Sequence, residues 1–179
     1  EKAYSLLENL LLWSRSQMSN LEFKPEKIEL SEAIILNMEL LKNNAMLKNI
    51  SLQNRIAENM VVLADRNMLE TILRNILSNA IKFTRQNGKV EIFSNLLDSA
   101  VEIGILDNGI GIETNNIEKL FRIDQSFSTY GTENETGTGL GLILCKEFIE
   151  KNYGKIWAES EIGKGTTFCF TIPINKNRI

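Results

Sequence analysis

The sequence has no histidine among its 179 residues. This absence excludes a Ser-His catalytic arrangement, a zinc site with histidine ligands and a histidine general base within the chain. The two cysteines, Cys145 and Cys169, do not have metal-ligand spacing and are too few for a disulfide framework. Both are therefore expected to be buried thiols.

Long apolar runs and blocks of basic residues are also missing. No uninterrupted apolar run reaches the roughly 18 residues that a membrane span requires, so no direct membrane contact is expected. The net charge is −3, from 20 Lys and Arg against 23 Asp and Glu, and no basic cluster occurs. This charge balance does not indicate the basic surface that a nucleic-acid-binding protein usually has. A hydrophobic fraction of 43% is typical of a globular domain with a substantial core.

The spacing of the apolar residues predicts the order of the elements. Strands are expected at 28–30, 50–56, 60–64, 89–94, 100–107, 156–160 and 166–172, and helices at 31–46, 65–84, 116–121 and 140–151. Ser31 and Asp65 are expected to cap the first two helices. This order predicts an α+β fold: a two-layer sandwich with a mixed, mostly antiparallel sheet of about five strands and about three helices, preceded by a further helix.

The first 24 residues form a separate unit in this pattern. Residues 4–21 contain neither Gly nor Pro, carry few charges and place Leu6, Leu10 and Trp13 at approximately helical spacing. A helix this apolar needs a partner, either the rest of the chain or a second copy. Pro25 marks a boundary, and residues 21–27 are expected to be a short linker. Two units are therefore predicted, 1–24 and 25–179.

The helix at 65–84 carries a polar stripe beside its apolar face. Asn75, Asn79 and Lys82 lie on one flank at the helical period. Amide oxygens can ligate a magnesium ion that also holds phosphate, and a lysine can meet phosphate as a point charge. Spacing alone favours a solvated helix edge, because polar stripes are what amphipathic helices normally carry.

Two glycine-rich stretches follow. The first, DNGIG at 107–111, ends an apolar strand, where the Asp107 carboxylate is free to bond a ligand; a strand-ending turn is an equal alternative. The second, GTGLG at 137–141, runs into an apolar helix, whose N-terminal N–H groups can bind an anion. It matches neither a P-loop nor a dinucleotide fingerprint, and alone it could be a hinge. The three elements together are more specific than any one of them.

In order and spacing, residues 75–84, 107–111 and 137–141 resemble the N, G1 and G2 boxes of sensor histidine kinases of two-component systems. Residues 154–173 resemble the C-terminal pattern of that family, and residues 20–30 resemble its link from dimerisation helices to ATP-binding domain. The similarity covers almost the whole chain. It implies the GHKL-type ATP-binding fold, with ATP and magnesium as ligands.

The resemblance also implies roles for single residues. Asn79 would ligate magnesium, Asn75 would lie beside the γ-phosphate, and Lys82 would contact phosphate, so these three would be the catalytic residues. Asp107 would accept a hydrogen bond from the adenine amine, supported by Thr167. The remaining cofactor contacts would come from Phe83 near the sugar or base, from Gly109, Gly111 and Ile112 around the base, and from Thr138, Gly139, Leu140 and Gly141 at the phosphates.

The chain departs from the family in the segment at 124–136, which would be the ATP lid. Family lids often carry a basic residue that meets the γ-phosphate, but residues 123–145 contain no Lys or Arg. Arg122 is the nearest substitute. Phe121 and Phe127 are present for the F box, but their pairing is not defined by the sequence.

The resemblance predicts a catalytic domain that transfers the ATP γ-phosphoryl group to a histidine on a dimerisation helix outside this sequence. Residues 1–24 would be the end of the second helix of that hairpin. The expected partners are a second copy, forming a homodimer through these helices, and a response-regulator receiver domain. The expected location is cytoplasmic. Two alternatives remain open: an ATPase clamp like those of gyrase and mismatch-repair proteins, and an ATP-sensing module without phosphotransfer.

Overall fold

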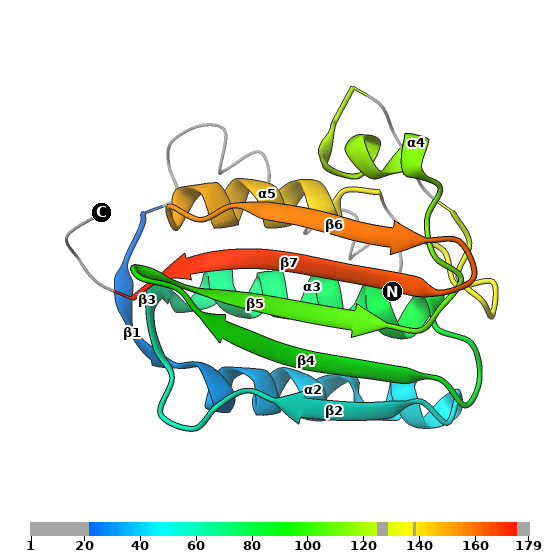
Figure 1. The fold of residues 1–179 in the computed structure, drawn as a ribbon, viewed down its shortest axis with the longest axis horizontal. Coiled ribbons are helices and arrows are strands. Elements are labelled where there is room, and N and C mark those ends of the chain that lie inside the picture. Colours follow the sequence, from blue (N-terminus) through cyan, green and yellow to red (C-terminus); the bar gives the residue numbers. More distant parts are fainter. Residues whose placement is uncertain (1–21, 125–128, 138, 175–179) are drawn as a thin grey trace.

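The computed structural model describes residues 22–124, 129–137 and 139–174, which fold into a sheet and a layer of helices on one of its faces (Figure 1). The sheet order is β2–β4–β5–β7–β6, formed by Ser51–Arg55, Lys89–Leu96, Ala100–Asp107, Gly165–Pro173 and Ile156–Glu161. β2 and β4 are parallel, and the other neighbours are antiparallel. The predicted two-layer α+β sandwich with a mixed five-stranded sheet is confirmed.

Three long helices cover the sheet. They are α2 (Leu30–Leu47), α3 (Arg66–Phe83) and α5 (Gly141–Lys151), and α3 packs against both of the others. A short helix, α4 (Thr114–Ile117), continues into a 3-10 turn at Glu118–Phe121 and lies beyond the β6 edge of the sheet (Figure 1). No helix in the described part of the chain has the length and apolarity of a membrane span.

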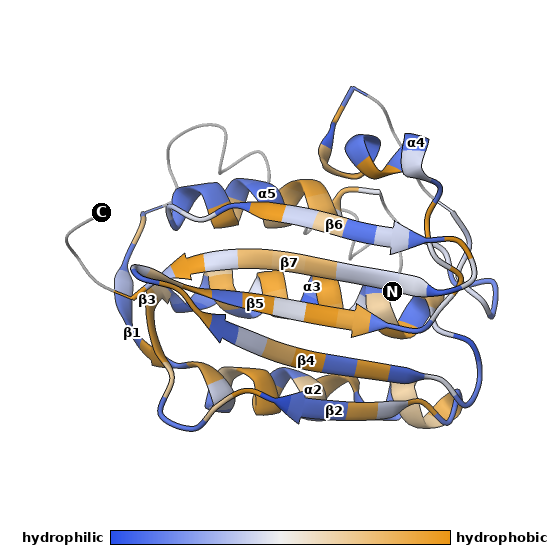
Figure 2. Cartoon of the chain, in the orientation of Figure 1, coloured by the Kyte–Doolittle hydropathy of each residue, from blue (hydrophilic) through white to orange (hydrophobic). Residues whose placement is uncertain are grey.

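The core lies between the two layers and follows the alternation of the strands. Ile103 and Ile105 of β5 and Phe170 of β7 are fully buried and face the helices, where Ile72 and Ile76 of α3 are also buried. Figure 2 shows apolar positions along β5 alternating with more polar ones, and a continuous apolar stretch in the middle of β7. The same alternation determines which side chains at the strand ends reach the site.

A two-stranded antiparallel ribbon stands apart from the main sheet. β1 (Pro25–Glu29) pairs with β3 (Val61–Asp65), and Ile28, opposite Val62, is buried. Residues 25–27 are therefore part of a strand, so the prediction of a linker at 21–27 was wrong for them. The helix expected at 4–21 lies outside the described residues, and the division into units 1–24 and 25–179 stays a prediction.

Of the two predicted helix caps, one is confirmed and the other is wrong. Asp65 caps α3 as predicted, because its carboxylate accepts the N–H of Met68 at 3.1 Å. Ser31 does not cap α2. The cap is Glu29, whose carboxylate accepts the N–H of Glu32 at 2.9 Å, so the helix begins earlier than the Ser31 signal indicated.

Candidate functional site

A cavity of about 530 Å³ lies at one end of the sandwich. Its walls come from α3, from the loop that follows β5, from the beginning of α5 and from residues 129–137. Small-molecule sites commonly have volumes of roughly 300–1,000 Å³. The three polar elements found in the sequence meet at this one cavity.

Asp107, the last residue of β5, lines the cavity. It follows Ile103 and Ile105 on the core face of β5, so its carboxylate is drawn between the layers and the residue is only 2% exposed. Oδ1 accepts the N–H of Gly109 at 2.8 Å and that of Thr166 at 3.3 Å. Burial raises the pKa of Asp107 to about 6, although these two hydrogen bonds act to lower it. Among the described residues nothing donates to Oδ2, which is therefore available to a ligand donor.

The β7 neighbour of Asp107 is Thr166, not Thr167. The two strands pair Asp107 with Thr166, and Thr166 lines the cavity. Because side chains alternate along a strand, Thr167 lies on the opposite face of the sheet, and the predicted support of Asp107 by Thr167 was wrong by one position. Phe168 and Phe170 share the core face with Thr166, so the alternation of these aromatic residues was the signal that could have found it.

The polar stripe of α3 also reaches the cavity. Asn75, Asn79 and Lys82 all line it. The Asn75 amide nitrogen donates to the carbonyl of Thr71 at 2.9 Å, which leaves its Oδ1 directed away from the helix. A Cβ added to Gly141 would lie 2.7 Å from this oxygen, so the N-terminus of α5 approaches Asn75 closely because Gly141 has no side chain. An amide oxygen and the start of a helix thus adjoin, which suits a hard cation together with an anion.

Lys82 is the only cationic side chain that lines the cavity among the described residues. Its Nζ donates to the carbonyl of Thr129 at 3.2 Å and lies 4.6 Å from the ring centroid of Phe83, which also lines the cavity. Burial lowers the pKa of Lys82, and the Glu135 carboxylate acts in the opposite direction. The ammonium group is thus partly desolvated and in contact with a carbonyl that an anionic ligand could replace.

The expected substitute for the basic lid residue is not at the cavity. Arg122 is exposed, does not line the cavity and forms a two-pronged ion pair with Asp124, at 3.0 and 2.7 Å. Thr138 lies outside the described residues. Gly139 lines the cavity, whereas Leu140 is the N-cap residue of α5.

Gly111 is required by the packing of the backbone. It has a φ of +72°, and a Cβ there would lie 2.1 Å from the carbonyl oxygen of Glu161, the last residue of β6. The two loops are also joined by the N–H of Gly163, which donates to the carbonyl of Ile110 at 2.8 Å. Gly111 and Ile112 line the cavity as expected. Gly109 contributes by its N–H bond to Asp107.

Several lining residues were not predicted. They form an apolar wall that includes Ile110, Leu120, Leu142, Ile162 and Phe168. Ile110 lies within the glycine-rich stretch at 107–111 and Leu142 directly follows the one at 137–141, but no local pattern indicated Leu120 and Ile162. An apolar wall ending at a buried carboxylate suits a flat ring that carries an amine.

The side chains at the cavity fit a metal ion that is held mostly by the bound substrate and only partly by the protein. The described residues contain no group of three His, Cys, Asp or Glu that could hold an ion. The side-chain oxygens of Asn75 and Asn79 fit magnesium, because this ion prefers oxygen ligands and is commonly held by a few protein groups together with substrate phosphates.

Comparison with known proteins agrees with this geometry. Residues 64–176 match the family described as histidine kinase-, DNA gyrase B-, and HSP90-like ATPase. The adaptive-response sensory kinase SasA of Prochlorococcus marinus (strain MIT 9301) is 33% identical over 157 residues, which cover 85% of this chain and 41% of that protein. The sensor histidine kinase WalK of Bacillus subtilis (strain 168) is 30% identical over 184 residues, covering 99% of this chain and 30% of WalK. The chain spans less than half the length of these relatives.

One solved structure is similar to this chain over nearly all of the solved chain's length. The nucleotide-free catalytic domain of the histidine kinase ThkA shares 33% sequence identity and a TM-score of 0.73, covering 86% of this chain and 97% of that one. The chain therefore belongs to the histidine kinase-, DNA gyrase B- and HSP90-like ATPases, and it contains the ATP-binding catalytic domain of a sensor histidine kinase.

Proposed function

We propose that this domain transfers the γ-phosphoryl group of magnesium-bound ATP to a histidine of a partner segment, within a two-component signalling protein. The bond from the γ-phosphorus to the bridging oxygen breaks, a bond to the imidazole nitrogen forms, and ADP leaves. One observation carries the proposal: the buried Asp107 carboxylate and the Asn75, Asn79 and Lys82 side chains all line a single cavity. This combination of a buried acceptor, amide oxygens and a cation matches a nucleotide, which has an amine at its base and anions at its tail.

Each residue of the site has a role in this proposal. Asp107 Oδ2 accepts a hydrogen bond from the adenine amine, and Phe83 packs near the sugar or base. Lys82 and the N–H groups at the start of α5 hold the phosphates in line with the acceptor. Asn79 holds magnesium with Asn75 close by. When bound, magnesium neutralises charge on the transferring group.

The acceptor and the partners lie beyond the described residues. The sequence contains no histidine, so the acceptor belongs to another segment or chain. Residues 1–24 are proposed as part of a dimerisation hairpin that pairs with a second copy. One solved structure, 27% identical to this chain with a TM-score of 0.75, is that of ThkA in complex with the response regulator TrrA. A receiver domain is the corresponding partner proposed here, and a cytoplasmic location would give both access to ATP.

The test of the proposal supplies the acceptor separately. The chain is incubated with γ-labelled ATP and magnesium, with and without the histidine-bearing hairpin of its parent protein. An acid-labile, base-stable label is expected on the hairpin and none on this chain, which has no histidine. A label on Ser, Thr or Asp of this chain, or steady ATP hydrolysis without transfer, would contradict the proposal and point to another reaction.

A second function is favoured by one observation. Residues 123–145 contain no Lys or Arg, and Lys82 is the only cation among the described residues that line the cavity. A module that senses ATP without transferring phosphate needs fewer groups at the γ-phosphate. ATP binding with no transfer to the hairpin would favour this function.

The affinity for the base should depend on pH through Asp107. Its pKa is about 6, and because Oδ1 already accepts two N–H groups, the proton adds to Oδ2, which faces the cavity. Protonation changes the acceptor into a donor, so the base binds the ionised form and binding weakens as the pH falls through 6. About tenfold weaker binding is expected at pH 5 than at pH 7.5, since below the pKa each pH unit lowers the ionised fraction about tenfold.

Adenosine is the ligand for this measurement, because it has no phosphates that titrate in the same range. Calorimetry at several pH values gives the affinity, and Asp107→Asn serves as the control that cannot titrate. A constant adenosine affinity between pH 7.5 and pH 5 in the unmodified protein would show that Asp107 does not meet the base.

A further inference from the structure

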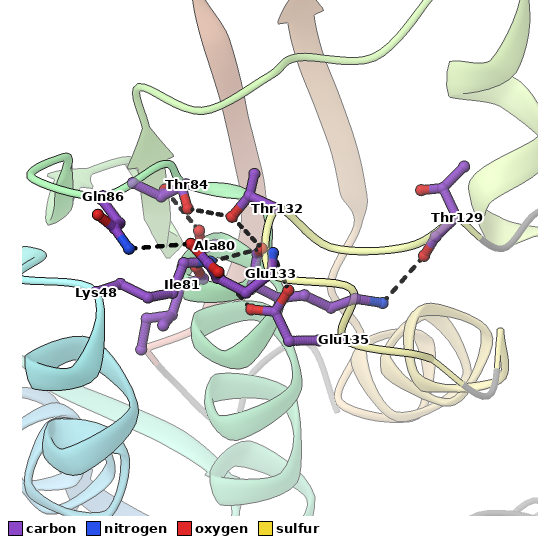
Figure 3. A network of polar contacts seen from close by, with 10 residues as sticks. Lys48, Ala80, Ile81, Thr84, Gln86, Thr129, Thr132, Glu133 and Glu135 are labelled. Atoms are coloured by element: carbon purple, nitrogen blue, oxygen red, sulfur yellow. Dashed lines mark hydrogen bonds and ion pairs between the residues drawn. The ribbon is translucent and has the colours of Figure 1, made fainter.

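Lys48, the C-cap residue of α2, is a buried cation with all three of its donors engaged. It is only 5% exposed, and its Nζ donates to the carbonyls of Ile81 and Lys82, both at 2.9 Å, and to Oε1 of Glu135 at 3.0 Å (Figure 3). An ammonium group has three N–H donors. Lys48 thus joins three parts of the chain: the end of α2, the end of α3 and the segment that leads to α5.

The two carbonyl partners belong to the last turn of α3, which ends at Phe83. Carbonyls in the last turn of a helix have no partner within the helix and carry the negative end of its dipole. A buried ammonium group at this point satisfies both carbonyls and balances their partial charge. The cation is therefore fixed to the helix that carries the site residues Asn75, Asn79 and Lys82.

Glu135 uses both of its carboxylate oxygens. Oε1 accepts from Lys48, and Oε2 accepts the N–H of Glu133 at 2.7 Å. The Glu135 carbonyl accepts the N–H of Gly131 at 2.8 Å, which closes a compact turn. Burial acts to raise the pKa of Glu135, but the hydrogen bonds to it, including that from Lys48, outweigh burial and hold its pKa below the ordinary value.

The same turn is attached to the end of α3 by its other residues. The N–H of Thr132 donates to the carbonyl of Lys82 at 3.1 Å, and its hydroxyl donates to the carbonyl of Thr84 at 2.8 Å (Figure 3). On one side of the turn, Thr129 receives the Lys82 ammonium group; on the other side, Thr136 and Gly137 line the cavity. The position of the turn thus determines both the surroundings of Lys82 and the positions of Thr136 and Gly137 at the cavity.

We infer that Lys48 and Glu135 form a positioning pair that holds residues 129–137 against the end of α3 and so aligns Lys82 and Gly137 with the nucleotide phosphates. Neither residue lines the cavity, so the pair acts through the groups it places. The inference rests on the proposed contact of Lys82 with phosphate. It assigns a role in phosphate binding to an ion pair that joins residues 87 positions apart.

Glu135→Gln is the first test. The amide that replaces the carboxylate has one acceptor oxygen, so it cannot serve both Lys48 and the Glu133 N–H, and it also loses the charge. The dissociation constant of ATP with magnesium is expected to rise about tenfold, whereas the affinity for adenosine, which reaches only the Asp107 end, should stay within twofold. Amide hydrogen exchange at Gly131 and Thr132 in the nucleotide-free protein should accelerate at least tenfold.

Glu133→Gln is the matched control. It removes the same charge from the same turn, but the Glu133 side chain is exposed and, among the described residues, accepts a hydrogen bond only from the Gln86 amide, at 3.2 Å. This variant should match the unmodified protein in all three measurements. Lys48→Met should reproduce the ATP loss, and adding Glu135→Gln to it should cause little further loss, because both changes break the same contact.

The outcomes separate the alternatives. Unchanged ATP affinity and unchanged hydrogen exchange in Glu135→Gln overturn the inference. An equal loss of ATP and adenosine affinity together with a lower melting temperature also overturns it, because that result would show that the pair only stabilises the fold. If Lys48→Met does not fold, Glu135→Gln and its control still decide. If the unmodified protein binds ATP no more tightly than adenosine, the proposed function fails, while hydrogen exchange still reports whether the pair holds the turn.

Discussion

Replacing Asn79 with alanine is expected to slow phosphoryl transfer about a hundredfold, with a much smaller loss of ATP affinity. The substitution removes an amide oxygen from the cavity and leaves a residue with high helix propensity in α3, so the fold should be retained. The base of the nucleotide should still bind to Asp107. The metal that Asn79 is proposed to hold acts mainly on charge and alignment in the transition state, so the rate suffers more than binding.

The measurement combines transfer rates with paired titrations. Unmodified and Asn79→Ala proteins are titrated with ATP, once with magnesium and once with EDTA, and transfer to the histidine-bearing hairpin is timed in parallel. The magnesium-dependent part of the affinity should shrink in the variant. If magnesium strengthens ATP binding equally in both proteins, Asn79 is not a metal ligand and the stripe on α3 is a solvated helix edge.

Asp107→Asn is expected to weaken ATP binding about tenfold to a hundredfold without loss of stability. Two N–H groups, from Gly109 and Thr166, require an acceptor at the position of Oδ1, so the new amide nitrogen must occupy the position of Oδ2. It then directs a donor at the adenine amine, a mismatch that costs on the order of 1–3 kcal/mol. The fold should tolerate the change, because burial already disfavours the charged form of Asp107.

A change of base preference provides the control for this prediction. Inosine triphosphate presents a carbonyl where adenine has its amine, so Asp107→Asn should lose much less affinity for it than for ATP. Calorimetry with both nucleotides measures the ratio. An unaltered preference for ATP over inosine triphosphate in the folded variant would place the base elsewhere.

The parts of the fold that follow a local rule could be predicted from the sequence. The apolar period of α3, its Asp65 cap and the alternation of β5 and β7 each depend on neighbours a few residues away, and the structure confirms all of them. The expected sandwich followed from the order of these elements. The linker prediction was wrong at 25–27 because the pairing of Pro25–Glu29 with the distant strand Val61–Asp65 has no local signature beyond a short apolar pattern.

The sequence predicted those parts of the site in which a single helix or loop carries several of the site residues. The helical period placed Asn75, Asn79 and Lys82 on one flank, and all three line the cavity. Contacts between distant segments were beyond such reasoning. Arg122 directly precedes the expected lid at 124–136, but it forms an ion pair with Asp124 and does not reach the cavity. Lys48 is far from the lid in sequence, yet its Nζ lies 3.0 Å from Oε1 of Glu135. Nothing in the sequence around Lys48 distinguishes it from an ordinary surface lysine.

The two ends of the cavity differ in what holds them in shape. At the Asp107 end, Gly111 packs on the carbonyl of Glu161 and Gly163 bonds Ile110, so neighbouring loops are locked by main-chain contacts. Around Lys82, residues 129–137 are attached to the end of α3 by one main-chain bond, from Thr132 to Lys82, and otherwise by side-chain contacts of Lys48, Thr132 and Glu135. An inhibitor fragment as small as an aminated heterocycle would therefore find its half of the cavity already formed. Because such a fragment would have little ordering entropy to offset, it should reach a high binding energy per atom, and added substituents directed toward Lys82 should contribute less for each atom.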